Sequence, residues 1–354
     1  MKSPRTSKLS RAKTQVDIVL VSVAIGLHSP GRGVAPNKGL ELTASSVRCA
    51  PASGSSSGLA LGIQRTGQSI MGKWLLVASG VIVGGAAVAV LLGQARETSR
   101  AEQMVATLLQ SASRPVRGTV DFDAFSALPP PVAHYFRHVL TDGQKLIRTT
   151  KMYQSGVLRT STTTESWSSF TASQLVVPPA TGFVWQAKVG MPFAAHVRIL
   201  DSYIAGIGAG RVSFLSAFAV ASAAGAPELN SGALHRYFAE AVWCPTALLP
   251  QSGVVWSPMN DHAAMATLTD RGTTVSLEFR FNEVGEVTGI YSPGRFGRFD
   301  SGYKRVPWEG HFRDYQVRAG MRVPLYGEVG WYDNGALQLV WKGNIMDAQY
   351  ELEP

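Results

Sequence analysis

Apolar residues follow three different patterns along this 354-residue chain. An uninterrupted apolar run occupies residues 74–93, helix-like spacing follows between residues 98 and 140, and apolar and polar residues alternate through much of the chain from residue 146. Side chains return to the same face every 3.6 residues in a helix and every 2 residues in a strand. The patterns therefore predict a long apolar helix, a helical lead-in and a β-sheet domain.

The apolar run predicts a transmembrane helix or a signal sequence. Trp74 to Gly93 is a stretch of 20 residues with no charge, and Ser79 is its one polar side chain. At a rise of 1.5 Å per residue such a helix is about 30 Å long, which matches the hydrocarbon core of a bilayer. A buried core helix is the alternative, but core helices of this length nearly always carry a polar stripe.

The residues before this run lack any sustained period. Residues 28–70 are rich in Gly, Ser, Pro and Ala, a composition that buries too little apolar surface to order itself. Met71 and Lys73 then stand directly before the apolar run, as at the start of a membrane-targeted chain. We therefore expect residues 1–70 to be a disordered extension or an artefact of upstream translation, and Met71 to be the natural start.

The charges that flank the apolar run bear on the orientation. Lys73 precedes the run, and Arg96 and Arg100 follow it, so the basic residues are nearly balanced. A short basic start favours an N-terminus inside the cell and a C-terminal domain outside the cytoplasm. The small residues around Gly93 and Ala95 also suit cleavage of a signal sequence, so residues 71–97 are either an anchor or a removable leader.

Helix-like spacing returns in three places beyond the run. Residues 98–111 follow the capping residues Thr98 or Ser99, and residues 129–140 open on prolines, which fit a first helical turn. A small, apolar stretch at 214–225 and a periodic stretch at 231–243 predict a helical insert over residues 214–243 within the sheet domain.

Between residues 146 and 354 the alternation predicts antiparallel strands. In residues 273–293 it places Val275, Leu277, Phe279 and Phe281 on one face, with a hairpin turn around residues 283–285. The fold class predicted is α+β: a curved, half-barrel-like antiparallel sheet with a few packing helices, preceded by one N-terminal transmembrane helix. The domain boundaries predicted are 1–70, 71–97, 98–145 and 146–354.

The charge of the chain argues against a nucleic-acid partner. Residues 1–70 carry a net charge of +7, and residues 71–354, which hold the predicted fold, carry only +2 of the total of +9. A phosphate-binding surface needs its basic residues on the folded domain. Cys49 and Cys244 lie in segments unlike parts of one domain, so we expect no structural disulfide.

Several stretches resemble a family of bacterial membrane-anchored proteins of unknown function. They are GALHRYFAEAVWCPTALLP (232–250), TTVSLEFRFNEVGEVTGI (273–290) and YKRVPWEGHFRDYQVRAGMRVPLYGEVGW (303–331). The resemblance covers roughly residues 100–350, and its Glu-x-x-Trp-x-Pro-Thr-x-Leu-x-Pro and Pro-Trp-Glu-Gly blocks are fairly specific. More loosely, the order of elements is similar to the lipoprotein carriers LolA and LolB. That likeness implies a curved sheet around an apolar cavity that holds lipid chains.

The candidate binding residues are acids and aromatic side chains of the sheet domain. Carboxylates that face one cavity can act as acid and base or bind a polar head group, and aromatic rings can line its walls. The tentative ligand-binding set is Glu240, Trp243, Trp256, Trp308, Glu309, Tyr315 and Glu328. Core packing explains the aromatic members equally well, and an i,i+4 pair with Arg236 at the surface explains Glu240.

The remaining motifs predict no catalytic residue, metal site or cofactor. His134 and His138 have the spacing of paired ligands, but Tyr135 stands where a zinc hydrolase needs Glu, and no third ligand is evident. The GIGAG stretch at 206–210 lacks the following helix of a nucleotide loop and predicts a turn. No Gly-x-Ser-x-Gly elbow is present in the sequence.

Three functions fit these observations. The leading hypothesis is a non-enzymatic, membrane-tethered, extracytoplasmic protein that binds an apolar or amphipathic, lipid-like ligand between the sheet and the helical insert. The first alternative is an enzyme that uses Glu240, Glu309 or Glu328 as acid or base. The second is a structural envelope protein that binds protein partners along a sheet edge.

Overall fold

The computed structural model describes residues 67–112, 118–159, 166–299 and 302–354. Most of the predicted N-terminal extension, with Cys49, lies outside these residues. Of the predicted membrane segment 74–93, the side chains of 75–80 and 82–83 also lie outside the described part. The chain from Val90 onward belongs to one compact unit, and residues 67–89 belong to another.

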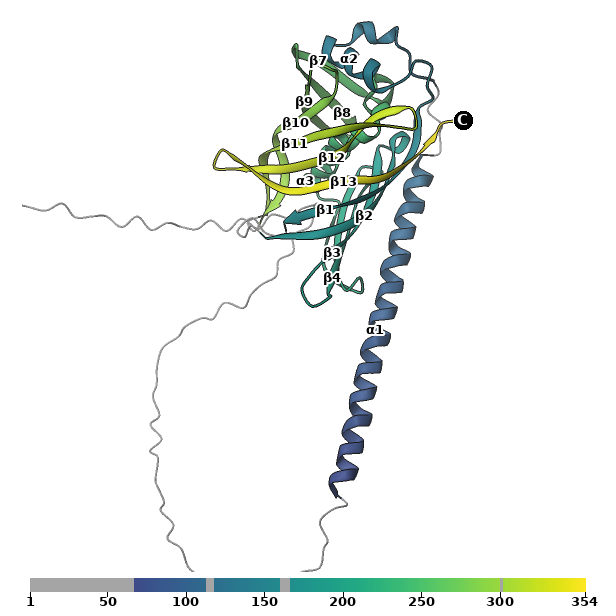
Figure 1. Cartoon of the computed structure of the whole chain (residues 1–354), viewed down its shortest axis with the longest axis vertical. Helices are drawn as coiled ribbons and strands as arrows, with labels where there is room; N and C mark the ends of the chain where they lie inside the picture. The colour runs from purple at the N-terminus through teal and green to yellow at the C-terminus, as the bar shows by residue number, and fades with distance from the viewer. Residues whose placement is uncertain (1–66, 113–117, 160–165, 300–301) are drawn as a thin grey trace, which may run out of the picture. The chain divides into compact units, whose positions relative to one another are not determined.

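The first helix, α1, spans Gly67–Ser111 (Figure 1). The helix predicted at 98–111 is confirmed, but its predicted start at Thr98 or Ser99 is wrong, because residues 98–111 are the C-terminal part of α1. No Pro interrupts residues 93–98, and Gln94, Ala95, Arg96 and Glu97 are good helix formers, so the helix continues through both capping residues. Among the residues that the structure describes, no helix is both long and apolar enough to cross a bilayer.

The fold predicted for the sheet domain is confirmed in its main feature, an open antiparallel sheet of 13 strands (Figure 1). The strands are β1 Ile147–Arg159, β2 Trp167–Val177, β3 Gly182–Gly190, β4 His196–Ile204, β5 Ile207–Phe214, β6 Phe218–Ala224, β7 Val254–Asn260, β8 Ala263–Asp270, β9 Thr273–Phe281, β10 Val287–Phe299, β11 Gly302–Arg318, β12 Met321–Asp333 and β13 Ala336–Leu352.

The order of strands is β6-β5-β4-β3-β2-β1-β13-β12-β11-β10-β9-β8-β7. Each half of the sheet is a meander, and the first and last strands join the halves at the centre, with Met152 opposite Ala348. Strands β6 and β7 are consecutive along the chain, yet they form the two opposite edges of the sheet. The chain between them must cross the whole sheet.

Helix α3, Pro227–Glu240, makes this crossing, followed by the short 3-10 turns η3 Ala241–Trp243, η4 Pro245–Leu248 and η5 Pro250–Ser252. It contacts β3, β4 and β5 in one half of the sheet and β9 and β10 in the other. One helix can touch both halves only because the sheet curves around it. The helix predicted at 231–243 is therefore confirmed, with a start four residues earlier.

The helix predicted over the first part of the insert, 214–225, is wrong. Residues 218–224 form the edge strand β6, which pairs with β5 after a turn at Leu215 and Ser216. Alanine has a high helix propensity, but pairing with β5 provides backbone partners that propensity does not capture.

Helix α2, Pro130–Val139, agrees with the helix predicted at 129–140, and the turn η1, Ala124–Ala127, precedes it. Its Phe136 ring lies edge-on to Trp256, and Tyr135 packs on Phe281. His134 and His138 of this helix lie beside Gly285, and no cluster able to hold a metal ion occurs in the described residues.

Side-chain alternation places the core where it was predicted. Val275, Leu277, Phe279 and Phe281 of β9 are all buried, and the β9–β10 hairpin turns at Gly285. The GIGAG stretch contains the β4–β5 turn, with positive φ at Ala205 and Gly206. The many aromatic residues of β9–β13 are thus largely explained by the alternation of an antiparallel sheet, as predicted.

A candidate ligand cavity on the concave face

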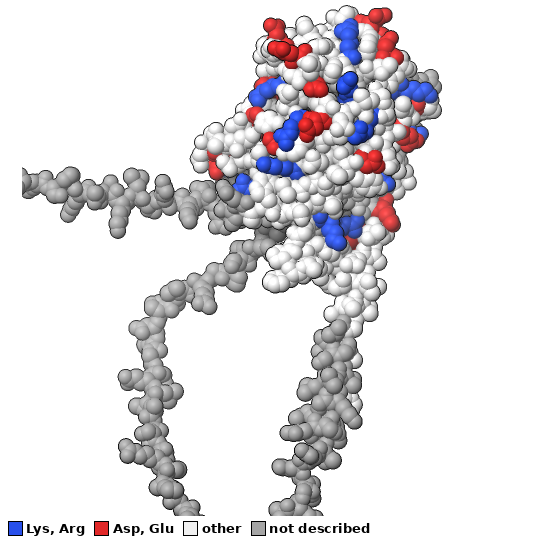
Figure 2. Space-filling model, in the orientation of Figure 1, with Lys and Arg blue, Asp and Glu red and all other residues white. Residues whose placement is uncertain are grey.

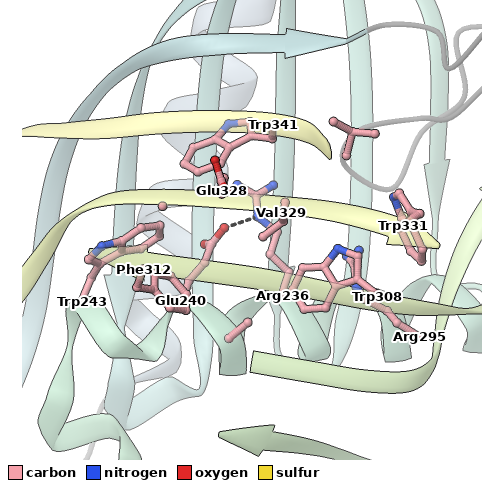
Figure 3. Close-up of a pocket in the computed structure, with 13 residues that line it drawn as sticks. Arg236, Glu240, Trp243, Arg295, Trp308, Phe312, Glu328, Val329, Trp331 and Trp341 are labelled. Atoms are coloured by element: carbon pink, nitrogen blue, oxygen red, sulfur yellow. Dashed lines mark hydrogen bonds and ion pairs between the residues drawn. The ribbon is translucent and has the colours of Figure 1, made fainter. Parts of the chain in front are cut away.

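A cavity lies between α3 and strands β10–β13 on the concave face of the sheet (Figure 3). Its volume is about 50 Å³, and about 610 Å³ when the open space at its mouth is included. The enclosed volume is well below the roughly 300–1,000 Å³ of typical small-molecule sites, so only a small group or the end of a chain fits inside it. The residues that line it are Arg236, Ala239, Glu240, Trp243, Arg295, Trp308, Phe312, Gly327, Glu328, Val329, Trp331, Val340 and Trp341.

Glycines in two neighbouring strands make room for the rings of this cavity. Gly327 of β12 and Gly343 of β13 are direct partners across the sheet. A β-carbon at Gly327 would lie 3.1 Å from Trp243, and one at Gly343 would overlap Trp341. The ring centroids of Trp243 and Phe312 are 5.9 Å apart in an edge-to-face arrangement. The Trp243 ring is fixed at its other end because Nε1 donates to the Pro324 carbonyl oxygen at 3.0 Å.

A buried arginine forms a second part of the cavity wall. The guanidinium of Arg295 lies 4.6 Å from the ring centroid of Trp308 and 5.0 Å from that of Trp331. Its Nε and Nη2 both donate to the carbonyl oxygen of Gly232 on α3. Within the described residues Arg295 forms no ion pair, and burial lowers its pKa to about 9, with a further contribution from nearby Arg236.

Arg236 of α3 bridges two acids on the same side of the cavity. Figure 3 shows its ion pair with one of them, Glu240. Its Nε donates to Glu240 at 2.7 Å, and its Nη1 donates to Asp201 of β4 at 3.0 Å. Asp201 is 1% exposed and its Oδ1 has no hydrogen-bond partner. Burial raises the pKa of Asp201 well above its usual value, although Arg236 acts in the opposite direction.

Hydrogen bonds extend this network along the concave face. Trp185 Nε1 donates to Gln154, Gln154 donates to Gln174, and Gln174 donates to Glu240 at 2.6 Å. This chain of hydrogen bonds ends at the Glu240 carboxylate. The carboxylate accepts from Gln174 of β2 and from Arg236 of α3. The network ties α3 to β1–β4 and fixes one side of the cavity.

A separate polar cluster occupies the opposite face of the sheet. The buried Glu309 carboxylate accepts hydrogen bonds from Arg280, His311 and Tyr332 at 2.8–3.0 Å. Burial acts to raise the pKa of Glu309, but these hydrogen bonds outweigh it and hold the pKa below its usual value. Glu328 borders the cavity, but its carboxylate accepts from Tyr326 and lies 3.5 Å from His311 Nδ1.

The structure brings four of the seven predicted site residues to the cavity: Glu240, Trp243, Trp308 and Glu328. Trp256 packs against Phe136 and Phe279 in the core below α2. Tyr315 donates its hydroxyl to the Val287 carbonyl oxygen, and Glu309 lies on the other face. These three residues take no part in lining the cavity.

The geometry gives little support to acid–base chemistry among the predicted glutamates. Strand alternation puts Glu309 on the face opposite Trp308, and Glu328 on the face opposite Val329, so their carboxylates lie away from that of Glu240. The surface ion pair proposed for Glu240 is in fact buried, because the Arg236 side chain is only 10% exposed. Cys244 is a buried free thiol whose pKa burial raises to about 12, which makes it a poor nucleophile.

Sequence reasoning missed Asp201, Arg295, Gln154 and Gln174. Asp201 carried a usable signal, because it is the one acid in residues 166–227 and stands within an apolar strand. A lone acid at such a position predicts a buried partner of opposite charge. Arg295 stands in the stretch SPGRFGRF, whose two arginines are indistinguishable by local pattern.

The fold and cavity define a class of protein: a curved antiparallel sheet that wraps a helix and encloses an aromatic pocket. The chain belongs to a family of unknown function (DUF6920), whose profile matches residues 126–350. This confirms the resemblance to an uncharacterised family. The matched region runs from η1 into β13 and contains the whole sheet except the last two residues of β13.

Comparison with individual proteins adds little. No curated protein matches the chain. Among solved structures, a LolA superfamily protein from Nitrosomonas europaea is similar at 10% sequence identity, over 66% of this chain and 96% of that chain, with a TM-score of 0.32. At this TM-score the likeness carries no argument about function.

Proposed function

We propose that this protein is a non-enzymatic, membrane-tethered protein that binds an apolar or amphipathic, lipid-like ligand in the cavity between α3 and β10–β13. The observation that carries the proposal is the composition of the cavity wall. Five aromatic residues face one space that also reaches two arginines and a glutamate; they are Trp243, Trp308, Trp331, Trp341 and Phe312. Pockets with apolar walls and a few convergent polar groups are typical ligand sites.

The two parts of the wall fit two parts of a ligand. An apolar end group packs against the aromatic rings, and a polar group reaches Arg236, Glu240 or Arg295. The deep volume of about 50 Å³ admits only the end of a chain, and the rest of the ligand lies in the open mouth. The residues proposed to contact it are the predicted Glu240, Trp243 and Trp308, joined by Arg295, Phe312 and Trp331.

The membrane tether in this proposal is residues 74–93, which have the length and composition of a spanning helix. Lys73 before the segment favours an extracytoplasmic C-terminal domain in a single-pass cell-membrane protein. Fractionation of cells that express the full chain tests this part, because a chain recovered from the soluble fraction contradicts it.

A cavity-filling variant tests the ligand site. In Gly327→Val the added β-carbon lies 3.1 Å from the Trp243 ring, beside the cavity, whereas in Gly289→Val, on the outer face, it meets its nearest atom at 3.4 Å. Both replacements suit a strand. The full chains are purified in detergent and extracted with organic solvent, and the ligand per chain is measured by mass spectrometry. We expect wild type and Gly289→Val to carry the same ligand and Gly327→Val to lose it; equal amounts in all three contradict the proposal.

A further inference from the structure

Two loops at one end of the domain expose large apolar side chains. The β3–β4 loop carries Met191 and Phe193, and Phe193 is fully exposed at 102%. The β5–β6 turn is flanked by Phe214 and Phe218, and Val220 follows on the edge strand β6; all three are exposed. We call these five residues the loop-end surface. Clusters of exposed apolar residues mark contact sites for proteins or membranes.

Hydrogen bonds show that the two loops lie side by side. The Leu215 amide donates to the His196 carbonyl oxygen at 2.9 Å, and His196 Nε2 lies 2.9 Å from Ser216 Oγ. Phe193, Ala194, Leu215 and Ser216 all have positive φ, a conformation that costs non-glycine residues about 1 kcal/mol or more each. Both pairs are the central residues of tight hairpin turns, which require positive φ there: Ala195 N–H donates to the Pro192 carbonyl oxygen, and Ala217 N–H to that of Phe214. The first of these turns leaves Phe193 in solvent.

The same end of the domain contacts α1 at the last residue of the predicted membrane segment. Gln94 Nε2 donates to the Leu215 carbonyl oxygen at 3.0 Å. Gly93 approaches Ala217 so closely that a β-carbon would lie 2.7 Å from its carbonyl oxygen. Leu91 and Leu92, which directly precede Gly93, are exposed. If residues 74–93 cross a bilayer, the loop-end surface lies at its boundary.

The charges near these loops suit an anionic surface. Between residues 166 and 227 the one acid is Asp201, which is buried on the concave face. Lys188 is exposed and forms no ion pair within the described residues, and it lines an outer-face groove with His196 and Arg198. The end of the domain where Figure 1 draws the β3 and β4 loops is almost free of charge in Figure 2.

We propose that the loop-end surface inserts into the head-group region of the bilayer, with Lys188 beside anionic lipid head groups. Apolar side chains at the boundary gain burial, and each lysine near an anionic surface adds about 1 kcal/mol of attraction. The inference rests on the proposed membrane segment and is independent of the ligand cavity. It gives the domain a fixed orientation, with α1 and the β3–β4 and β5–β6 loops at the lipid surface.

Fluorescence quenching in vesicles tests the orientation. The full chain with Cys49→Ser is labelled with an environment-sensitive fluorophore at Phe193→Cys or, as a control, at Ile207→Cys. Ile207 is also exposed but follows the far end of β4, about 30 Å away for nine residues of strand. The chains are reconstituted into phosphatidylcholine and phosphatidylglycerol vesicles that contain a nitroxide-labelled lipid.

We expect the label at 193 to shift to the blue and lose fluorescence to the quencher, while the label at 207 keeps its emission. Lys188→Gln should weaken the increase in quenching at 193 that accompanies a rising phosphatidylglycerol fraction. Equal quenching at 193 and 207, or none at 193, overturns the proposal. Flotation of the same vesicles distinguishes failure of the loop contact from failure of the membrane segment. A chain that does not float refutes both. A chain that floats but carries an unquenched label at 193 refutes only the loop contact.

Discussion

Arg236 and Arg295 are the residues that most distinguish the interior of this domain. Each lies against aromatic rings, and the Arg236 guanidinium is 4.7 Å from the ring centroid of Trp185. Buried ion pairs contribute little net stability, because desolvation offsets their attraction, whereas loss of one partner is strongly destabilising. The placement of these charges beside a cavity therefore fits ligand recognition better than it fits stabilisation of the fold.

Replacement of Arg236 should show how strongly the loss of one partner of a buried ion pair destabilises the domain. Arg236→Met leaves Asp201 and Glu240 without their cation, and we expect a loss of about 3–5 kcal/mol in the free energy of unfolding. Arg148 makes a control because its ion pair with Glu351 lies at the surface, with side chains 49% and 61% exposed. Arg148→Met should cost about 0–1 kcal/mol. Urea unfolding of the two variants measures the difference, and similar losses would refute the interpretation.

His235 should make the stability depend on pH. Burial lowers the pKa of His235 to about 4, with smaller contributions from Arg295 and Arg305. Between pH 6.5 and about 4 the unfolded chain binds a proton that the folded chain does not, so this contribution to stability falls as pH falls. The slope is up to about 1.4 kcal/mol per pH unit.

The matched variant is His235→Gln, which can still donate to the Ser231 carbonyl oxygen near Nδ1. Urea midpoints at several pH values between 7 and 4.5 should fall more steeply for wild type than for the variant. Parallel curves would show that His235 is already protonated or exposed in the folded state.

Among the elements, α3 depends on close approach to the sheet. A β-carbon at Gly208 of β5 would lie 2.7 Å from the Leu229 carbonyl oxygen and 2.9 Å from the Ala233 β-carbon. One at Gly232 of α3 would lie 2.8 Å from the Phe296 carbonyl oxygen. The contacts at Leu229 and Phe296 are to backbone atoms, which cannot turn aside, so two glycines set how deeply the helix sits in the curved sheet.

Gly208→Ala should therefore lower the free energy of unfolding by about 1–3 kcal/mol through overpacking. Gly190→Ala, at the end of β3, meets its nearest atom at 3.4 Å and should change stability by less than about 0.5 kcal/mol. Chemical denaturation compares the pair. A neutral Gly208→Ala variant would mean that α3 can move outward without loss.

Most elements could be predicted from the sequence because alternation is a local signal. The strand faces of β9 and the turn at Gly285 follow from residue types alone. The two errors have a common origin, which is a misleading local preference. The Ala-rich residues 218–224 favour a helix, and Thr98 and Ser99 favour the start of one. Pairing with β5 and continuation of α1 override this preference, and neither contact is visible in the neighbouring residues.

At the scale of the whole molecule, the cavity exists because strands far apart in the chain meet. β1 pairs with β13, and α3 crosses from one sheet edge to the other, so the wall joins residues 236–243 to residues 295–341. The sequence pattern put Trp308 among the candidate binding residues but could not show that its strand lies beside Glu240. Glu309 and Tyr315 were misplaced for the same reason, since register alone decides which face a residue shares.

The central claim is that a ligand occupies the aromatic cavity, and site-specific crosslinking in cells tests it most directly. The full chain is expressed with p-benzoylphenylalanine in place of Phe312, within the cavity, or of Val317, which is 53% exposed on the same strand. After irradiation, mass spectrometry identifies any adduct. We expect a lipid-like adduct with Phe312→p-benzoylphenylalanine and none with the Val317 variant. No adduct at 312, or the same adduct at both positions, would contradict the account.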